Sequence, residues 1–327
     1  MAKALHIIPY QAHFAELWDA FVDGSSQGTV FHKQNFLAYH ENEKILSKNF
    51  HHLLFYRGDA LVGLLPLGLV LEKDILTLKS PFGASFGGFI TQENSLVDAN
   101  EMILALLQYA QEKNIGLIKV TPSPQCYRKK LDDNFDFALL KNGFQLVNRD
   151  LCQVVDIHNR TEEEIFSSYT YACQKQIRKA ERAGFMIHEN PDLKSFHALL
   201  VENRQRHGIK PTHTLQDLHK LFQLIPEELK LFGIYLGEEL QAGMLCFKAN
   251  NRVLLNFYTC QSEKATGRGI SNLLVHESLM WALKAGFWTY DFGTSSLQME
   301  PNFGLIRFKE SFGGGSILRD TYLWEKT

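Results

Sequence analysis

The segment 264–269 combines the residue types that bind a phosphate group. It reads Lys-Ala-Thr-Gly-Arg-Gly and stands where a strand pattern gives way to a helix pattern. Glycine lets the backbone approach a ligand closely, and free amides at the N-terminus of a helix attract an anion. A basic side chain next to such amides suits a pyrophosphate. The residues predicted to bind this group are Lys264, Gly267, Arg268, Gly269 and Ser271.

Glycines at this spacing also occur in ordinary tight turns from a strand into a helix, so on this segment alone both interpretations stay open. Two other phosphate-binding motifs are excluded. The sequence lacks the pattern Gly-x-x-x-x-Gly-Lys-Ser/Thr of a P-loop. The Asp-Phe-Gly at 291–293 is not accompanied by the glycine-rich loop and the His-Arg-Asp segment of a protein kinase.

A strand, a helix and a second strand are expected to position this segment. Residues 253–260 are β-branched, aromatic and apolar, a mixture that is typical of a strand. From Ile270 onward the apolar residues follow a helical period, and Gly286 is expected to end that helix. Residues 287–292 then return to a strand pattern. This order places the predicted anion site at the N-terminus of the helix.

Length and composition indicate a globular protein of two domains. A chain of 327 residues can form two hydrophobic cores, and contents of 45% hydrophobic and 21% charged residues are ordinary for such proteins. The formal net charge of −2 creates no overall attraction to nucleic acid or to an anionic membrane. We therefore expect no DNA partner, and any contact with a polyanion must be local.

Cysteine usage and hydropathy predict a cytoplasmic protein. The five cysteines are scattered without Cys-x-x-Cys spacing, which favours reduced thiols. None of the thirteen histidines has the spacing of metal ligands, so no metal site is expected. The longest apolar run, residues 60–71, is too short for a transmembrane segment, and the N-terminus is too polar for a signal peptide.

The two halves of the sequence repeat one order of predicted elements. Three pairs of positions share an offset of 170, namely Gly116 and Gly286, Gly143 and Gly313, and Arg149-Asp150 and Arg319-Asp320. Each Arg-Asp pair precedes a strand pattern, at 151–157 and at 321–324. We predict two copies of one α/β unit, residues 1–157 and 158–327. The first copy has Phe-Gly-Gly-Phe at 86–89, which carries no basic residue.

A basic stripe follows the predicted boundary. Thr161 and Glu164 form a capping-box pattern, which predicts that a helix begins there. Four basic residues then fall on one helical face: Lys175, Arg178, Lys179 and Arg182. Charged stripes are most often solvated faces of a helix. The alternative is that this stripe contacts a phosphate-bearing substrate or partner.

Several segments resemble the FemAB-related, BioF2-like branch of the GNAT acyltransferases. They are residues 174–184 (QKQIRKAERAG), 203–211 (NRQRHGIKP), the hairpin at 235–247, and 291–314 (DFGTSSLQMEPNFGLIRFKESFGG). Segment 264–269 is similar to the family's acyl-donor loop, with Lys264 where the family has Gln or Arg. The resemblance implies an α/β (α+β) fold of two tandem GNAT-like lobes with a cleft between them. Each lobe would be a mixed, mostly antiparallel sheet flanked by helices.

The resemblance also implies an N-acyltransferase. Members of this branch acylate amines, and the best understood ones transfer amino acids from aminoacyl-tRNA to peptidoglycan precursors. In them the lysine of a C-terminal Phe-Lys motif stabilises the charged tetrahedral intermediate, and Phe308-Lys309 matches this motif. Basic residues that hold the acceptor's phosphates would correspond to Lys33 and Arg204. The expected partner is an amine-bearing acceptor that is phosphorylated or related to the cell wall.

Acyl transfer to an amine needs a positive charge for the developing oxyanion and a route for the amine's proton. Lys309 can supply the charge, unless it is a surface lysine of the last helix. Asp291 could orient a lysine or act as a base, or it could stabilise a turn. Tyr258 could donate a proton to a leaving thiolate, although aromatic residues of strands mostly belong to the core. The first lobe would be structural or acceptor-binding, and the second donor-binding and catalytic.

Two features favour acyl-CoA as the co-substrate, with no permanently bound cofactor. Members that read tRNA usually carry a long helical arm or a basic groove and tend to lose the donor-loop glycines. This sequence has no such arm, and it keeps Gly267 and Gly269. Two alternatives stay open: a tRNA-dependent aminoacyltransferase acting on a peptidoglycan precursor, and a catalytically silent nucleotide-binding duplicate. A silent copy would need neither the intact loop nor the Phe-Lys motif.

Overall fold

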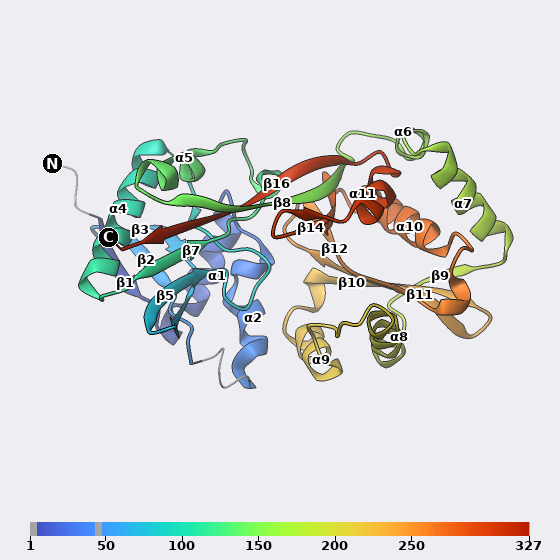
Figure 1. The fold of residues 1–327 in the computed structure, drawn as a ribbon, viewed down its shortest axis with the longest axis horizontal. Coiled ribbons are helices and arrows are strands. Elements are labelled where there is room, and N and C mark those ends of the chain that lie inside the picture. Colours follow the sequence, from blue (N-terminus) through green and yellow to red (C-terminus); the bar gives the residue numbers. More distant parts are fainter. Residues whose placement is uncertain (1–4, 43–47, 94, 327) are drawn as a thin grey trace. The chain divides into compact units, whose positions relative to one another are not determined.

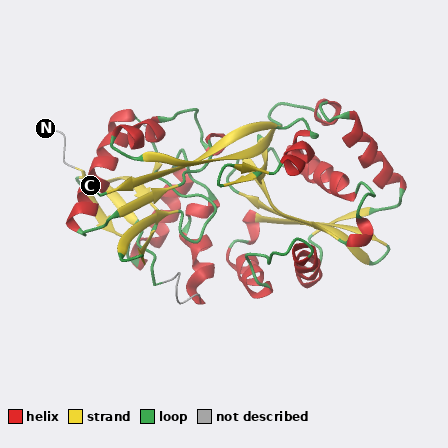
Figure 2. Ribbon diagram, in the orientation of Figure 1, coloured by secondary structure: helices red, strands yellow, loops and turns green. Residues whose placement is uncertain are grey.

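The structure is a computed structural model that describes residues 5–42, 48–93 and 95–326. Helices and strands are mixed along the whole chain (Figure 2). The chain divides into two compact units. Unit 1 consists of Met1–Asp150 and Leu318–Thr327, and unit 2 consists of Leu151–Ile317. Within the described ranges, no helix is both long enough and apolar enough to cross a membrane.

Unit 1 contains an antiparallel sheet in the order β1-β2-β3-β6 and a further run of strands in the order β4-β5-β7-β16. In the second run β5 and β7 are parallel, and the other neighbours are antiparallel. The strands are β1 (Leu5–Pro9), β2 (Leu53–Arg57), β3 (Ala60–Leu65), β4 (Gly68–Glu72), β5 (Ile75–Ser80), β6 (Ile90–Thr91), β7 (Leu117–Val120) and the end of β16 (Gly315–Glu325). The helices are α1 (Ala15–Gly24), α2 (Gln34–Leu37), α4 (Leu96–Glu112) and α5 (Asn134–Lys141).

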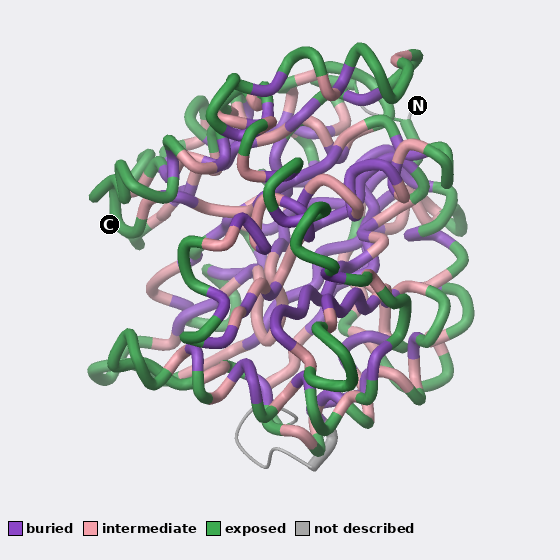
Figure 3. Tube along the Cα trace, turned by 90° about the vertical axis from the view of Figure 1, so that its right-hand side faces the viewer, coloured by how far each residue is buried: buried purple, intermediate pink, exposed green. Residues whose placement is uncertain are grey.

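The core of unit 1 forms where α4 covers strands β2, β3 and β7. Apolar residues of α4 recur at helical spacing, and Met102, Ile103 and Leu106 are fully buried. They pack in one cluster with residues such as Phe55 and Ile118. Figure 3 shows the buried positions gathered inside the fold and the exposed ones along the outer loops.

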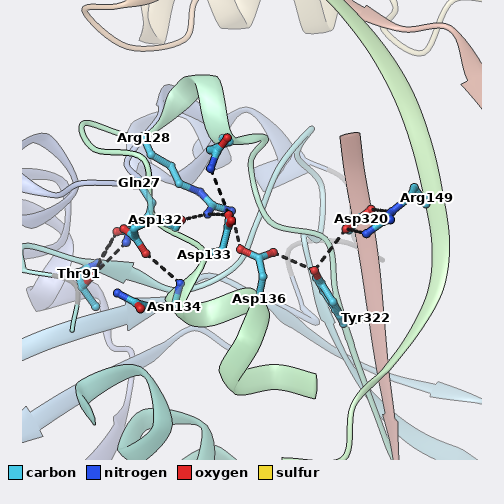
Figure 4. A network of polar contacts seen from close by, with 11 residues as sticks. Gln27, Thr91, Arg128, Asp132, Asp133, Asn134, Asp136, Arg149, Asp320 and Tyr322 are labelled. Carbon is cyan, nitrogen blue, oxygen red and sulfur yellow. Dashed lines mark hydrogen bonds and ion pairs between the residues drawn. The ribbon is translucent and has the colours of Figure 1, made fainter. Parts of the chain in front are cut away.

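A polar network joins several segments of unit 1 (Figure 4). The Tyr322 hydroxyl donates to Asp136 Oδ1 at 2.9 Å, and Arg128 pairs with the other oxygen of that carboxylate at 2.9 Å. The two duplicated Arg-Asp pairs also meet, because Arg149 makes two hydrogen bonds of 2.8 Å to Asp320. Burial, followed by the Asp136 charge, raises the pKa of Tyr322, which keeps its hydroxyl protonated as the donor.

Unit 2 contains strands in the order β8-β13-β12-β11-β10-β9, in which β12 and β13 are the parallel pair. The strands are the end of β8 (Gln145–Asp156), β9 (Met186–Glu189), β10 (Leu229–Leu236), β11 (Glu239–Lys248), β12 (Val253–Gln261), β13 (Thr289–Thr294), β14 (Ser296–Leu297) and β15 (Glu300–Pro301). The helices are α6 (Glu162–Ser167), α7 (Tyr171–Arg182), α8 (Leu193–Gln205), α9 (Leu215–Leu224), α10 (Ile270–Lys284) and α11 (Phe303–Glu310).

Helices cover both faces of the unit 2 strands. In Figure 1, α7 and α10 lie on one side of β10 to β12, and α8 and α9 lie on the other. Ile177 of α7 and Leu274 of α10 share a core cluster with Met244 and Leu254 of the strands. On the opposite face, Gly243 of β11 leaves room for the ring of Phe196 from α8, because a Cβ atom at this glycine would overlap the ring. Mixed, mostly antiparallel strands flanked by helices confirm the predicted fold class.

The last predicted strand of each copy, at 151–157 and at 321–324, does not pair with strands of its own copy in the examples below. β8, which contains the predicted strand 151–157, pairs with β13, for example Val154 with Asp291. The end of β16 pairs with β7, for example Tyr322 with Val120. Each strand therefore belongs to the unit formed mainly by the other copy. Local strand patterns predict that a strand forms, but the partner is chosen by tertiary packing, so the division of the chain differs from the predicted boundary at residue 157.

Several local predictions agree closely with the structure. The helix predicted from Ile270 is α10, and Gly286 follows it with a φ of +82°. The predicted capping box at Thr161 and Glu164 is present, but it starts only the short helix α6. A second N-cap at Thr170, whose hydroxyl accepts from the Cys173 amide, starts α7 separately. The basic stripe lies on α7, and all four of its basic residues are exposed.

Candidate active site

Strands β12 and β13 separate soon after they begin to pair. Their parallel pairing covers only Val253–Leu255 and Thr289–Asp291. Beyond Leu255, β12 continues to Gln261 with β11 on one side, and its ladder with β11 is shifted between Leu245 and Cys246. Beyond Asp291, β13 stays beside β8. The two parallel strands therefore diverge toward their C-terminal ends, which is where α/β folds commonly bind ligands.

A cavity of about 620 Å³ occupies this opening, a volume within the usual range for small-molecule sites. It is lined by β12 and β13, by α11, by the loop before α10, by the middle of α7 at Gln176, and by the C-terminal end of α8. The lining residues that could contact a ligand through polar groups are Gln176, Asn203, Arg204, His207, Asn256, Thr259, Gln261, Gly267, Gly269, Ser271, Asn272, Thr294 and Lys309. All of them belong to unit 2.

The two glycines of the loop before α10 have different roles. Both have a left-handed backbone, with φ values of +74° at Gly267 and +78° at Gly269. A Cβ atom at Gly269 would overlap the carbonyl oxygen of Gln176, so this glycine allows α10 to start against α7. A Cβ atom at Gly267 would meet nothing within 4 Å, and Gly267 lines the cavity. Only Gly267 therefore leaves open space for a ligand.

The N-terminus of α10 is open toward a ligand. Gly269 is the N-cap residue, and among the described residues no side chain caps this end of the helix. The amides of the first turn and the positive end of the helix dipole are therefore suited to an anion. Ser271 lies in this turn, and its hydroxyl donates to Gln261 Oε1 at 2.8 Å.

Three cations lie at the loop, namely the predicted Lys264 and Arg268 and, in addition, Lys179. Lys264 is 78% exposed and lies 3.4 Å from Glu239, and the Arg268 guanidinium stacks on Phe185 at 4.7 Å from the ring centre. Lys179 of α7 instead contacts the loop directly, because its ammonium donates to the Gly267 carbonyl at 2.9 Å. The basic stripe thus reaches the loop through Lys179, which was expected to face an acceptor and not the anion site.

Lys309 lies at the other side of the cavity on α11 and is only 5% exposed. Its ammonium donates to the Gly293 carbonyl at 2.8 Å, the Thr294 carbonyl at 3.0 Å and the Ser295 hydroxyl at 2.7 Å. Burial lowers the pKa of Lys309 to about 8, although the nearby Asp291 carboxylate opposes this shift. The residue is therefore a cation near neutral pH, held at the end of β13.

Asp291 and Tyr258 are not among the residues that line the cavity, but each contacts residues next to it. Asp291 is fully buried, and its Oδ1 accepts from the Gly293 amide at 2.6 Å, so it shapes the turn that binds Lys309. The Tyr258 hydroxyl lies 2.8 Å from His213 Nδ1, and its ring packs under Arg204. The cavity is lined by the neighbours of Tyr258 on β12, Phe257 and Thr259. Both residues are thus placed to position other groups.

The predicted acceptor residues are divided between the two units. Arg204 and Phe308 line the cavity. Arg178 is exposed on α7, with its guanidinium 5.5 Å from the centre of the Phe166 ring. Lys33 belongs to unit 1, where it pairs with Asp23 at 2.7 Å. The structure therefore brings Arg204 and Phe308 together with Lys309, Gly267 and Ser271.

Three polar residues that line the cavity were not among the predicted site residues: Asn203 and His207 at the end of α8, and Gln176 of α7. Asn203 and His207 stand four positions apart and line the cavity with Arg204. The Asn203 amide donates to the Gln261 carbonyl at 3.2 Å, which joins the end of α8 to the end of β12. The i, i+4 spacing of these polar residues was the available signal. Gln176 gave no such signal, because its role depends on contact with Gly269.

Comparisons with known proteins agree with this architecture. A family model described as an acetyltransferase (GNAT) domain matches residues 167–309. The crystal structure of FemX is 13% identical and has a TM-score of 0.72, covering 98% of this chain and 97% of that chain. A tandem GNAT protein from the clavulanic acid biosynthesis pathway is 11% identical, with a TM-score of 0.55 and coverage of 98% of both chains.

L-PGS from Bacillus licheniformis is 16% identical, with a TM-score of 0.55 and coverage of 81% of each chain. At these identities the likenesses show the fold. No curated protein sequence matches the chain.

Proposed function

Residues 167–309 are a GNAT acetyltransferase domain in a chain with the FemAB-like tandem GNAT fold, and from this premise we propose a specific acyl transfer. The acyltransferase moves an acyl group from an acyl-CoA-type thioester to an amine. The observation that carries this proposal is the cavity between the diverging strands β12 and β13, with the open N-terminus of α10 at one side and Lys309 at the other.

The donor's phosphates would bind at the start of α10. Gly267 leaves space for them, the first-turn amides face them, and Lys179 lies at the same loop. The extended arm of coenzyme A contains amide groups, and these can pair with the edge of β12 beyond Leu255 in the manner of an added strand. This arrangement directs the thioester along β12 toward α11.

Lys309 would stabilise the charge that develops during transfer. The amine nitrogen bonds to the thioester carbonyl carbon, and the carbonyl oxygen becomes an oxyanion. Collapse then breaks the carbon–sulfur bond, the amine loses a proton and the thiolate takes one up. To contact the oxyanion, the Lys309 ammonium redirects one N–H from the Gly293, Thr294 or Ser295 oxygens. Asp291 supports this role because its charge favours protonated Lys309.

The acceptor would enter from the side of α8 and α11. Arg204 and His207 line this part of the cavity and can bind an anionic group, such as a phosphate, on the amine-bearing molecule. Lys33 and Arg178 remain proposed contacts for the same class of acceptor. An acceptor related to the cell wall would satisfy this description.

Thermal stability measured with different donors tests the proposal. Coenzyme A and acetyl-CoA at millimolar concentration are expected to raise the melting temperature of the full chain, since a ligand that binds only the folded state stabilises it. Transfer RNA and aminoacyl-tRNA serve as the comparison. If charged tRNA raises the melting temperature and coenzyme A and its thioesters do not, the donor is an aminoacyl-tRNA and our assignment is wrong.

A further inference from the structure

An exposed apolar surface lies next to Lys309 and has no part in the mechanism above. It consists of Leu297, Met299, Phe303 and Leu305, which we call the apolar lip. Their exposed fractions are 75%, 61%, 65% and 37%, respectively. Single exposed apolar residues are common, but four within nine positions of one hairpin and helix start form a local patch of the kind that marks a binding surface.

The hairpin that carries the lip has a strained tip. Strands β14 and β15 pair Leu297 with Glu300, and the two residues between them, Gln298 and Met299, have φ values of +52° and +66°. Glycine or asparagine usually occupies both central positions of such a turn. Non-glycine residues in this conformation persist where surrounding contacts determine it, and they concentrate at ligand sites. The turn therefore presents Met299 outward at an energetic cost.

The base of the hairpin is tied directly to Lys309. The Ser295 hydroxyl accepts from the Lys309 ammonium, and the Ser295 carbonyl accepts from the Asn302 amide at 2.9 Å across the base of the hairpin. Asn302 in turn caps α11, with its Oδ1 accepting from the Leu305 amide at 3.0 Å. These bonds fix the position of the lip relative to the ammonium group.

The lip is also continuous with the cavity. Leu305 is partly exposed and lines the cavity one helical turn before Lys309, and Phe308 lies beside it on the same wall. A molecule whose reactive group lies at Lys309 can therefore extend along Leu305 onto Phe303, Met299 and Leu297. Because these side chains face solvent outside the cavity, such a molecule comes from the acceptor side and not from the donor loop before α10.

We propose that the apolar lip binds an apolar portion of the acceptor, close to its reacting amine. The acceptor is then an amphiphilic primary amine, with a hydrocarbon or aromatic part within a few bonds of the nitrogen. This inference rests on the proposed acyl transfer and names the class of acceptor. Burial of each methylene against such a surface should strengthen binding by about fourfold.

The test uses ethylamine, butylamine, hexylamine and octylamine as acceptors with acetyl-CoA. We expect kcat/KM of the unmodified protein to rise by about fourfold per methylene. In the double variant Leu297→Gln and Met299→Gln this dependence on chain length should become nearly flat. The matched control is Leu131→Gln, which replaces a leucine of unit 1 that is 82% exposed, and it should keep the full dependence.

Three outcomes would overturn the proposal. One is an equal chain-length dependence in the unmodified protein and the double variant. The second concerns the acyl group, compared with acetyl-CoA and hexanoyl-CoA as donors. If the double variant loses the dependence of kcat/KM on acyl length but keeps its dependence on amine length, the lip binds the donor and not the acceptor. The third is binding to phosphatidylcholine vesicles that the double variant abolishes, since the lip would then insert into a membrane.

A binding measurement separates this proposal from the proposed function. Calorimetric titration with octylamine in the absence of any donor should show binding to the unmodified protein and to Leu131→Gln, and at least tenfold weaker binding to the double variant. If no amine is acylated but this pattern holds, the acyl-transfer assignment fails and the lip assignment stands. If acylation occurs and octylamine binds all three proteins equally, the lip assignment fails.

Discussion

The glycine loop of unit 1 and the glycine loop of unit 2 follow equivalent strands, but their backbone groups have different surroundings. In unit 1 the Gly87 amide donates to the Thr121 carbonyl at 3.0 Å, and the Gly87 carbonyl accepts from His32 at 3.1 Å. The Gly88 amide donates to the Ser80 hydroxyl at 2.9 Å. In unit 2, Gly267 lines a cavity, and only Lys179 contacts its carbonyl among the bonds described above.

The helix that follows each loop and the parallel strands beside it also differ between the two units. The N-cap Ser95 of α4 accepts from the Asp98 amide, whereas α10 begins at a glycine. Strands β5 and β7 pair up to Ser80 and Val120, and Gly87 bridges to Pro122 just beyond, while β12 and β13 diverge after three pairs. The cavity at Gly87 and Gly88 measures about 20 Å³ and the one at Ser80 and Thr121 about 220 Å³, whereas the unit 2 cavity measures about 620 Å³. The two units therefore differ in how far their parallel strands stay paired and in whether a side chain caps the helix that follows the loop.

The difference extends to the residue proposed for the chemical step. Leu139 stands 170 positions before Lys309, on the equivalent helix α5, and is fully buried. Exchanging a cation for an apolar residue at this position removes the charge that an oxyanion requires. The comparison therefore predicts which single changes should make unit 2 behave like unit 1.

The largest effect is expected from Lys309→Leu, which gives unit 2 the residue of unit 1. Turnover should fall by about 100-fold, the scale observed when one oxyanion-stabilising group is removed. Initial rates at saturating substrates measure this loss, with Lys284→Leu on α10 as an exposed control. Stabilisation by coenzyme A should be retained, which shows that the variant is folded. Unchanged turnover would remove Lys309 from the mechanism.

The next largest effect is expected from Gly267→Val, which fills the space left for the donor's phosphates. Coenzyme A at 100 times its Kd would stabilise the unmodified protein by about 2.7 kcal/mol, and the variant should lose this stabilisation. The matched control is Gly286→Val, because Gly286 also has a left-handed backbone, with a φ of +82°, and open space around it. Thermal unfolding with and without coenzyme A measures both variants. Equal loss in both would show that backbone strain, and not the donor site, is responsible.

The pH dependence of turnover tests whether the charge of Lys309, which unit 1 lacks at the equivalent position, is required. Lys309 is protonated below its pKa of about 8, so kcat should decline above that pH by about tenfold per pH unit. Asp291→Asn keeps an oxygen acceptor for the Gly293 amide but removes the negative charge that raises the pKa of Lys309. The decline should therefore begin at lower pH in this variant. Superimposable profiles of kcat against pH for the two proteins would contradict the assignment.

The smallest effect is expected on the basic stripe. The first helix of unit 1, α1, carries acidic residues, whereas α7 carries the stripe with Arg178 exposed. Arg178→Glu should raise the apparent KM for a phosphorylated acceptor by roughly threefold, and by more at low salt, because screening then weakens. Lys284→Glu is the control on α10. If Arg178→Glu lowers the melting temperature and leaves KM unchanged, the stripe has a structural role.

Local sequence patterns predicted the elements of the site well. Helix α10 begins at the predicted residue Ile270, and the predicted capping box of Thr161 and Glu164 is present. The glycines and Phe308-Lys309 stand out in the sequence because their chemistry depends on residue type and on neighbours within a few positions. Such signals are short-range, as turns, caps and helical periods are, and they do not require knowledge of the rest of the chain.

The tertiary structure decided which of these residues face one another. Gly267 and Gly269 look equivalent in sequence and both line the cavity, yet Gly269 packs against the Gln176 carbonyl and only Gly267 has open space where a Cβ atom would lie. The three oxygens that hold Lys309, the arrival of α8 beside β12, and the partners of β8 and β16 also depend on segments far apart in the chain. Packing between distant elements is set by the whole core, so no local pattern specifies it.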